Sequence, residues 1–96
     1  MKVVSRPKSA SAQKAHQHWE RGVAKLKNKE WGAALEAFDA AVKLRPDDPL
    51  YRLNAARCCL ELARFEQALA HANRAAELEP GSEVAAFMRV RAMHRL

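Results

Sequence analysis

The chain matches itself when it is displaced by 34 residues. Trp31 then falls on Phe65 and Pro46 falls on Pro80. Like the two prolines, the other matching residues are identical: Leu26 and Leu60, Ala34-Leu35 and Ala68-Leu69, Ala41 and Ala75, and Leu44 and Leu78. Periods of this length are typical of solenoids, in which each repeat packs only on its neighbours. The sequence therefore predicts full repeats at 15–48 and 49–82 and a half repeat from residue 83 onward.

Each repeat has the spacing of two helices. Small and apolar residues recur three and four positions apart, as on one face of a helix. In the first repeat one such set is Trp19, Gly22, Val23 and Leu26, and a second is Ala34, Leu35, Phe38, Ala41 and Val42. Alanine dominates the apolar residues, which also favours closely packed helices over sheets. We therefore expect an all-α chain of about five helices.

The breaks between these helices coincide with prolines and capping residues. Pro46 lacks an N–H donor and ends the second helix, while Asp48 can cap a helix that begins at Pro49. Ser82 is the corresponding cap of the last helix, and Ser9 or Ser11 that of the first. The expected elements are a flexible basic tail at 1–10, a helical domain at 11–96, a break at Asn28-Lys29-Glu30, helices at 49–62 and 65–78 joined by an Ala63-Arg64 turn, and a last helix at 83–95.

Length and charge limit the classes of function. With 96 residues the chain forms one small domain, and no apolar stretch reaches the length of a membrane span. The net charge of +6 is concentrated at the two ends, but no basic run is dense or interleaved with aromatic residues. Nucleic acid is therefore an unlikely partner. The first residues contain no apolar segment of the kind found in secretory signals, so we expect a cytoplasmic protein.

The residues that could carry chemistry form no recognisable site. Cys58 and Cys59 are adjacent, and neighbouring helical residues point about 100° apart, so we expect core cysteines in a reducing compartment. The histidines show no i, i+4 pair and are expected at the surface or its edge: His16, His18, His71 and His94. We expect no metal, no cofactor and no catalytic residue, and hence a protein that is not an enzyme.

The repeats resemble those of the tetratricopeptide repeat (TPR) family. The matching residues are Gly22, Trp31, Ala34, Phe38, Ala41 and Pro46 in the first repeat, and Ala56, Phe65, Ala68, Ala75 and Pro80 in the second. The resemblance covers about residues 15–96. It implies a right-handed α-solenoid of antiparallel helix pairs that acts as a non-catalytic protein–protein interaction module.

The resemblance also implies that the first helix of each repeat lines a concave groove for a peptide or helix of a partner. The groove residues carried over are Trp19, Val23, Leu26, Leu53, Asn54, Arg57, Leu60, Phe87 and Arg91. For Val23, Leu53 and Leu60 a place in the core between the repeats is an equal alternative. An apolar row beside a basic row suits an acidic or amphipathic ligand.

Some family members, the co-chaperones of heat-shock chaperones, grip a terminal Glu-Glu-Val-Asp sequence with five residues: Lys, Asn, Asn, Lys and Arg. The corresponding positions here hold Trp19, Val23, Asn54, Val84 and Met88. Only the asparagine matches. We therefore do not expect this chain to bind a chaperone tail through such a clamp.

The last helix departs from the pattern of a terminal repeat. Its residues Val84, Phe87, Val90 and Met93 are all apolar, whereas a terminal repeat normally has a polar outer face. An alternative role is therefore assembly, as a homo-oligomer that self-associates through Val84, Val90 and Met93. The chain could equally be the N-terminal fragment of a longer TPR protein.

Overall fold

The computed structural model describes residues 10–96, which form five helices and no strand. The helices are α1 (Ala10–Lys27), α2 (Trp31–Leu44), α3 (Pro49–Glu61), α4 (Phe65–Leu78) and α5 (Glu83–Arg95). The predicted all-α fold is confirmed. Ser11 lies inside α1 and so is not its cap, and Ala10, expected in the tail at 1–10, is the first residue of α1. Ser9 and the other residues of that tail, 1–9, lie outside the described residues.

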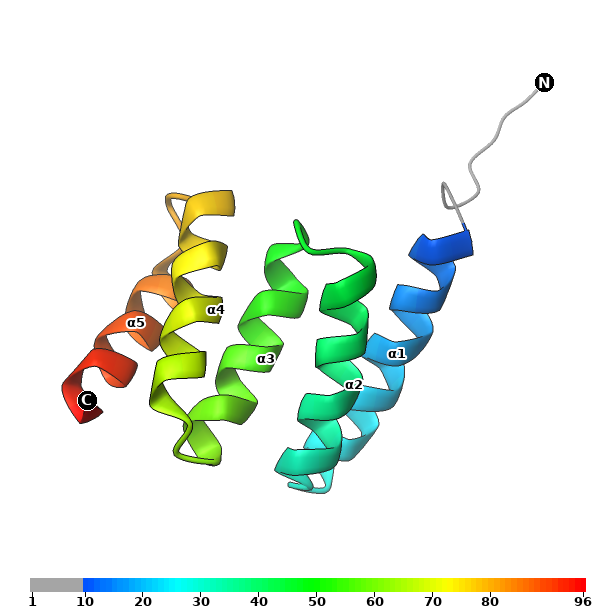
Figure 1. The fold of residues 1–96 in the computed structure, drawn as a ribbon, viewed down its shortest axis with the longest axis horizontal. Coiled ribbons are helices and arrows are strands. Elements are labelled where there is room, and N and C mark those ends of the chain that lie inside the picture. Colours follow the sequence, from blue (N-terminus) through cyan, green and yellow to red (C-terminus); the bar gives the residue numbers. More distant parts are fainter. Residues whose placement is uncertain (1–9) are drawn as a thin grey trace.

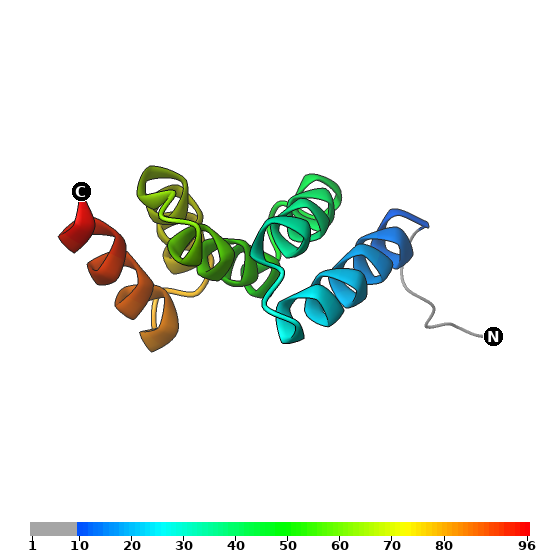
Figure 2. The ribbon, with the colours of Figure 1, turned by 90° about the horizontal axis from the view of Figure 1, so that it is seen from below.

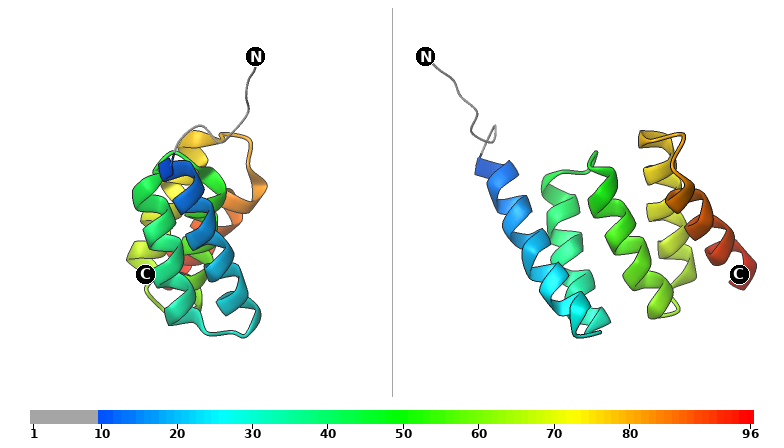
Figure 3. Two further views of the ribbon diagram at one scale, coloured as in Figure 1. Left: turned by 90° about the vertical axis from the view of Figure 1, so that its right-hand side faces the viewer. Right: turned by 180° about the vertical axis from the view of Figure 1, so that it is seen from behind.

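The helices stack side by side, and each contacts the next one along the chain (Figure 1). They form two layers, with α2 and α4 on one side and α1, α3 and α5 on the other (Figure 2). Seen from behind, α1 and α5 lie in front of α2 and α4 (Figure 3). Helix α3 also contacts α5, so the first helices of the second and third repeats lie directly against each other.

Prolines and side-chain caps set the starts of α3 and α5, as the sequence predicts. The Asp48 carboxylate accepts hydrogen bonds from the amides of Leu50 (3.0 Å) and Tyr51 (3.3 Å). The Ser82 hydroxyl accepts one from the amide of Ala85 (3.1 Å). These contacts satisfy amides that have no carbonyl partner in the first turn of a helix.

The first helix of each full repeat ends in the same left-handed turn. Lys29 and Ala63 adopt φ angles of 61° and 60°. The amides that follow bond back across the turn: Glu30 N donates to Lys25 O (3.0 Å), and Arg64 N donates to Cys59 O (2.8 Å). This is the Schellman arrangement, whose left-handed residue is most often glycine. The break expected at Asn28-Lys29-Glu30 is therefore a capped helix end.

The two hairpins hold different pairs of residues at equivalent positions. Gly22 of α1 lies against the fully buried Phe38 of α2, and a Cβ added at Gly22 would lie 2.6 Å from Phe38 Cε1. The equivalent residues of the second repeat are Ala56 and Ala72, both fully buried. The Phe38 ring of the first hairpin therefore leaves room only for glycine at position 22, whereas the second hairpin has alanine at both positions.

Cys58 and Cys59 are fully buried and are not joined in a disulfide, which confirms the expectation of core cysteines. Burial raises the pKa of Cys58 to about 12 and that of Cys59 to about 11. A thiol with so high a pKa is a poor nucleophile and a poor metal ligand, because both roles require the thiolate.

Candidate functional site

An apolar row crosses the surface formed by the first helices. Trp19 of α1, Leu53 of α3 and Phe87 of α5 occupy equivalent positions in the three repeats. Trp19 and Leu53 are half-buried, whereas Phe87 is 60% exposed. The apolar area open to solvent thus increases toward α5. We call the surface carrying this row, together with Asn54, Arg57 and Arg91, the first-helix face.

A hydrogen bond holds α1 and α3 together on this face. The indole Nε1 of Trp19 donates to Asn54 Oδ1 over 2.7 Å. The ring of His16 stacks on the ring of Trp19, with the two ring centroids 5.4 Å apart. The Asn54 oxygen, an acceptor that a ligand could otherwise use, therefore already has a partner within the chain.

The two arginines of the basic row have different surroundings. Arg57 Nε lies 3.4 Å from Glu61 Oε2, and its guanidinium lies 5.5 Å from the ring centroid of Trp31. The guanidinium of Arg91 lies 5.8 Å from the Phe87 ring centroid, and no carboxylate of residues 10–96 pairs with it. A stacked guanidinium keeps its N–H groups free at its edge. Arg91 is thus the more available cation.

Other predicted site residues lie partly or wholly in the core. Leu60 is only 8% exposed and packs in the main core cluster, so it cannot line an accessible wall. Of the two roles left open for Leu60, the structure shows the core role, and the groove assignment is corrected. Val23 and Leu26 are half-buried and pack against the same cluster. They present only part of their side chains to solvent.

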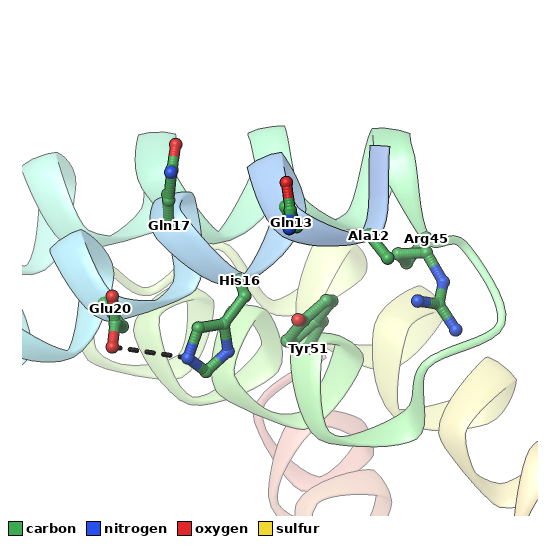
Figure 4. Close-up of a pocket in the computed structure, with 7 residues that line it drawn as sticks. All are labelled: Ala12, Gln13, His16, Gln17, Glu20, Arg45 and Tyr51. Atoms are coloured by element: carbon green, nitrogen blue, oxygen red, sulfur yellow. Dashed lines mark ion pairs between the residues drawn. The ribbon is translucent and has the colours of Figure 1, made fainter. Parts of the chain in front are cut away.

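A pocket that the sequence did not indicate lies beside the first half of α1 (Figure 4). It has a volume of about 640 Å³ and is lined by Ala12, Gln13, His16, Gln17, Glu20, Arg45 and Tyr51. His16 Nε2 lies 3.2 Å from Glu20 Oε2 within it. Burial raises the pKa of the Tyr51 hydroxyl, which stays protonated and can donate a hydrogen bond. Residues far apart in the chain form this pocket, which repeat spacing alone cannot show.

His71 links the two repeats, a contact that sequence reasoning missed. Its Nε2 lies 3.6 Å from Asp39 Oδ1 of α2, and its Nδ1 lies 3.3 Å from Arg52 Nη1 of α3. The side chain is 17% exposed, between the surface and the core. This histidine therefore has a structural partner on each side.

The exposed side of α5 is apolar, as the sequence predicts. The exposed fractions are 52% for Val84, 65% for Val90 and 54% for Met93. No other helix of the described chain covers Val90 or Met93.

Within residues 10–96, no group of three or more His, Cys, Asp or Glu side chains could hold a metal ion. None of the helices described is both long and apolar enough to cross a bilayer.

Comparison with known proteins identifies relatives of the chain. A sequence profile described as "Tetratricopeptide repeat" matches residues 25–90. The chain is 31% identical over 88 residues to Protein STIP1 homolog of Dictyostelium discoideum. It is 30% identical over 74 residues to small glutamine-rich tetratricopeptide repeat-containing protein 2 of Mycosarcoma maydis. These alignments cover 92% and 77% of this chain, but only 16% and 21% of those proteins.

Solved structures show the same arrangement of helices. The TPR domain of Arabidopsis OM64 superposes with a TM-score of 0.85 and 27% identity, over 88% of this chain and 70% of that one. The first TPR of Spaghetti (RPAP3), bound to the HSP90 peptide SRMEEVD, superposes with a TM-score of 0.82 and 24% identity. That alignment covers 88% of this chain and 67% of the other.

Proposed function

Because this chain belongs to the tetratricopeptide repeat family, we propose that its first-helix face binds a segment of a partner protein and catalyses no reaction. The observation that carries the proposal is the row of Trp19, Leu53 and Phe87, which runs across three helices and ends in a largely exposed ring. A row of this kind can accept the apolar side of a peptide or helix. The Trp19–Asn54 bond supports the proposal, since it fixes the row before a ligand arrives.

The chemistry of the face favours an acidic or amphipathic segment. Arg57 and Arg91 lie beside the apolar row, and the Arg57 side chain is 47% exposed. Guanidinium groups bind carboxylates in pairs of parallel hydrogen bonds. A ligand with apolar side chains on one side and a carboxylate about one turn further on would use both rows.

The ligand we propose is not a chaperone tail held by its terminal carboxylate. Of the five residues that the family's clamp would need, this chain has only Asn54, whose oxygen accepts from Trp19. Val23 and Val84 offer no charge at the clamp positions that other members fill with polar or basic residues. Internal acidic side chains, not a chain end, are therefore the groups to test.

The test is to measure acidic peptides selected from a library by fluorescence anisotropy. Arg57→Glu with Arg91→Glu should lower the affinity by more than about tenfold, a loss of roughly 1.4 kcal/mol. Lys43→Glu with Arg64→Glu is the control, because it changes the net charge equally at exposed sites outside the face. Circular dichroism should show unchanged helicity in both. Equal losses in the two variants, or no loss in the first, would overturn the assignment of the face.

The proposal also includes a location for the protein and a second role for α5. Cys58 and Cys59 are buried and are not joined in a disulfide, which suits the reducing cytoplasm that we propose as the location. The exposed residues Val84, Val90 and Met93 favour a second role for α5, the docking of another helix. A second copy of this chain is one candidate for that helix, and light scattering of the wild type and of Val90→Glu with Met93→Glu would detect it.

A further inference from the structure

Helix α5 has the position of the first helix of a repeat, but no second helix of that repeat follows it within the described residues. When the chain is displaced by 34 residues, Val90 of α5 falls on Ala56 of α3, and by another 34 on Gly22 of α1. Met93 falls in the same way on Cys59. A second helix covers the earlier residues: α2 lies against Gly22, and α4 covers the fully buried Ala56 and Cys59. Val90 and Met93 are instead 65% and 54% exposed.

We propose that this open side of α5, made by Ala86, Val90 and Met93, binds an acidic amphipathic helix of a partner protein. The helix would lie where α2 and α4 lie in the two complete hairpins. This site adjoins the first-helix face, with which it shares Arg91, and it extends the proposed function to a second surface of α5.

The charge of α5 defines the chemistry of the partner. The helix carries three arginines and His94 against a single acidic residue, Glu83; the arginines are Arg89, Arg91 and Arg95. A partner helix with acidic residues on either side of an apolar stripe would complement it. The chain's own second helices have this balance, since α2 carries two acidic residues to one basic, and α4 carries two acidic residues to one arginine.

A hollow that borders Val90 gives a place for one acidic side chain. It has a volume of about 390 Å³ and is lined by Val90, Arg91, His94 and Arg95. Its walls combine the apolar surface of Val90 with two guanidinium groups. A glutamate next to an apolar residue of the bound helix could pair its carboxylate with the Arg91 guanidinium, while the Arg95 guanidinium packs 5.2 Å from the ring centroid of Phe65 in α4.

The same charges argue against a second copy of this chain as the occupant. Two α5 helices packed face to face would bring together three arginines from each, with only one Glu83 per helix to offset them. Like charges become more costly as water is excluded from an interface. We therefore do not expect self-association through this side, and the experiment must distinguish it from binding of a partner helix.

The probe is a designed helical peptide of the length of α4, with leucines at i, i+3, i+4 and i+7 and glutamates on both sides of that stripe. A matched peptide carries lysines in place of the glutamates. We expect the acidic peptide to bind at least about tenfold more tightly in fluorescence anisotropy, with a preference that weakens as salt is raised. Val90→Glu with Met93→Glu should abolish the binding, because it places charge in the centre of the contact.

Ala33→Glu with Ala70→Glu is the control, because it adds the same charge at exposed positions of α2 and α4. Equal affinity for the two peptides, or no effect of the changes at Val90 and Met93, would overturn the proposal. So would light scattering that shows a dimer which the α5 variant converts to a monomer, since a second copy would then occupy the site. The changes at Val90 and Met93 leave the Trp19–Leu53 part of the first-helix face intact, so failure of this site is distinguishable from failure of the other.

Discussion

At the scale of single residues, Trp19 has two roles on the first-helix face. Its ring packs against both core clusters, and its N–H is bound to Asn54. The bond costs the face one free acceptor but stabilises the relative position of α1 and α3. A half-buried hydrogen bond of this kind contributes about 1 kcal/mol and keeps the indole in one orientation.

Replacing Gly22 by alanine should destabilise the protein. The new Cβ would lie 2.6 Å from the Phe38 ring, and the fully buried ring has no room to move. We expect the free energy of unfolding in urea to fall by about 1–3 kcal/mol, more than the gain in helix propensity.

Gly32→Ala is the matched control, since it lies in α2 and a Cβ there meets nothing within 4 Å. It should stabilise the chain by about 0.5–1 kcal/mol. The combination of Gly22→Ala with Phe38→Ala recreates the Ala56–Ala72 pair and should cost less than the sum of its two single changes. Additive costs would mean that Gly22 and Phe38 do not constrain each other.

The buried thiols predict a loss of stability in alkali. In the unfolded chain a thiol ionises near its ordinary pKa of 9.0, whereas burial raises the pKa of Cys58 to about 12 and of Cys59 to about 11. The stability present below pH 9 should therefore be lost progressively as pH rises from 9 toward 11. Urea midpoints measured across this range would follow the loss. Cys58→Ala with Cys59→Ala should flatten the slope, and an unchanged slope would assign it to other groups.

The sequence predicted some of these residue roles and missed others. Adjacent cysteines on a helix with small neighbours were recognisable as core, and the 34-residue spacing placed Trp19, Leu53 and Phe87 in one row. The spacing did not show that Asn54 is occupied by Trp19, 35 residues away, or that Leu60 is covered. A repeat defines the face on which a side chain lies, but its contacts depend on the neighbouring helix.

At the scale of the elements, the starts of helices were more predictable than their ends. Pro49, Asp48 and Ser82 carry recognised capping signals, and the structure uses all three. The ends of α1 and α3 have no glycine, so nothing in the sequence marks the left-handed residues Lys29 and Ala63. Closing bonds within each turn stabilise a backbone conformation that costs L-residues about 1–2 kcal/mol.

Glycine at either turn should therefore stabilise the chain. We expect Lys29→Gly and Ala63→Gly each to raise the free energy of unfolding by about 0.5–1 kcal/mol, the relief of strain less the added entropy of the unfolded chain. Thermal melts followed by circular dichroism would measure it. Ala24→Gly, at an exposed position inside α1, should have the opposite sign, and a loss of stability at all three sites would show that Lys29 and Ala63 are unstrained.

At the scale of the whole molecule, each hairpin depends on the next. His71 of the second repeat contacts Asp39 of the first across the boundary between the repeats, and α3 contacts both α4 and α5. The stacking of two repeats and a half could be predicted from the 34-residue period. The pocket beside α1 could not, because it forms where the turn residue Arg45 lies close to the first helix.

The whole surface should not distinguish a peptide by its terminal carboxylate. For the peptide SRMEEVD we expect the free-acid and C-terminally amidated forms to bind this chain with equal affinity, because Trp19, Val23 and Val84 replace polar or basic clamp residues. Isothermal titration of both forms is the measurement. A free acid that binds tenfold more tightly would show that another cation, such as Arg91, holds the chain end.

Because the two hairpins are packed with different residues, their helices cannot be exchanged with one another. If recombination joined α1 to α4, Gly22 would face Ala72 and leave a void. The reciprocal product would join α3 to α2 and force Ala56 against Phe38. Although the two repeats share one pattern, their halves are not interchangeable, and each hairpin can be transplanted only as a unit.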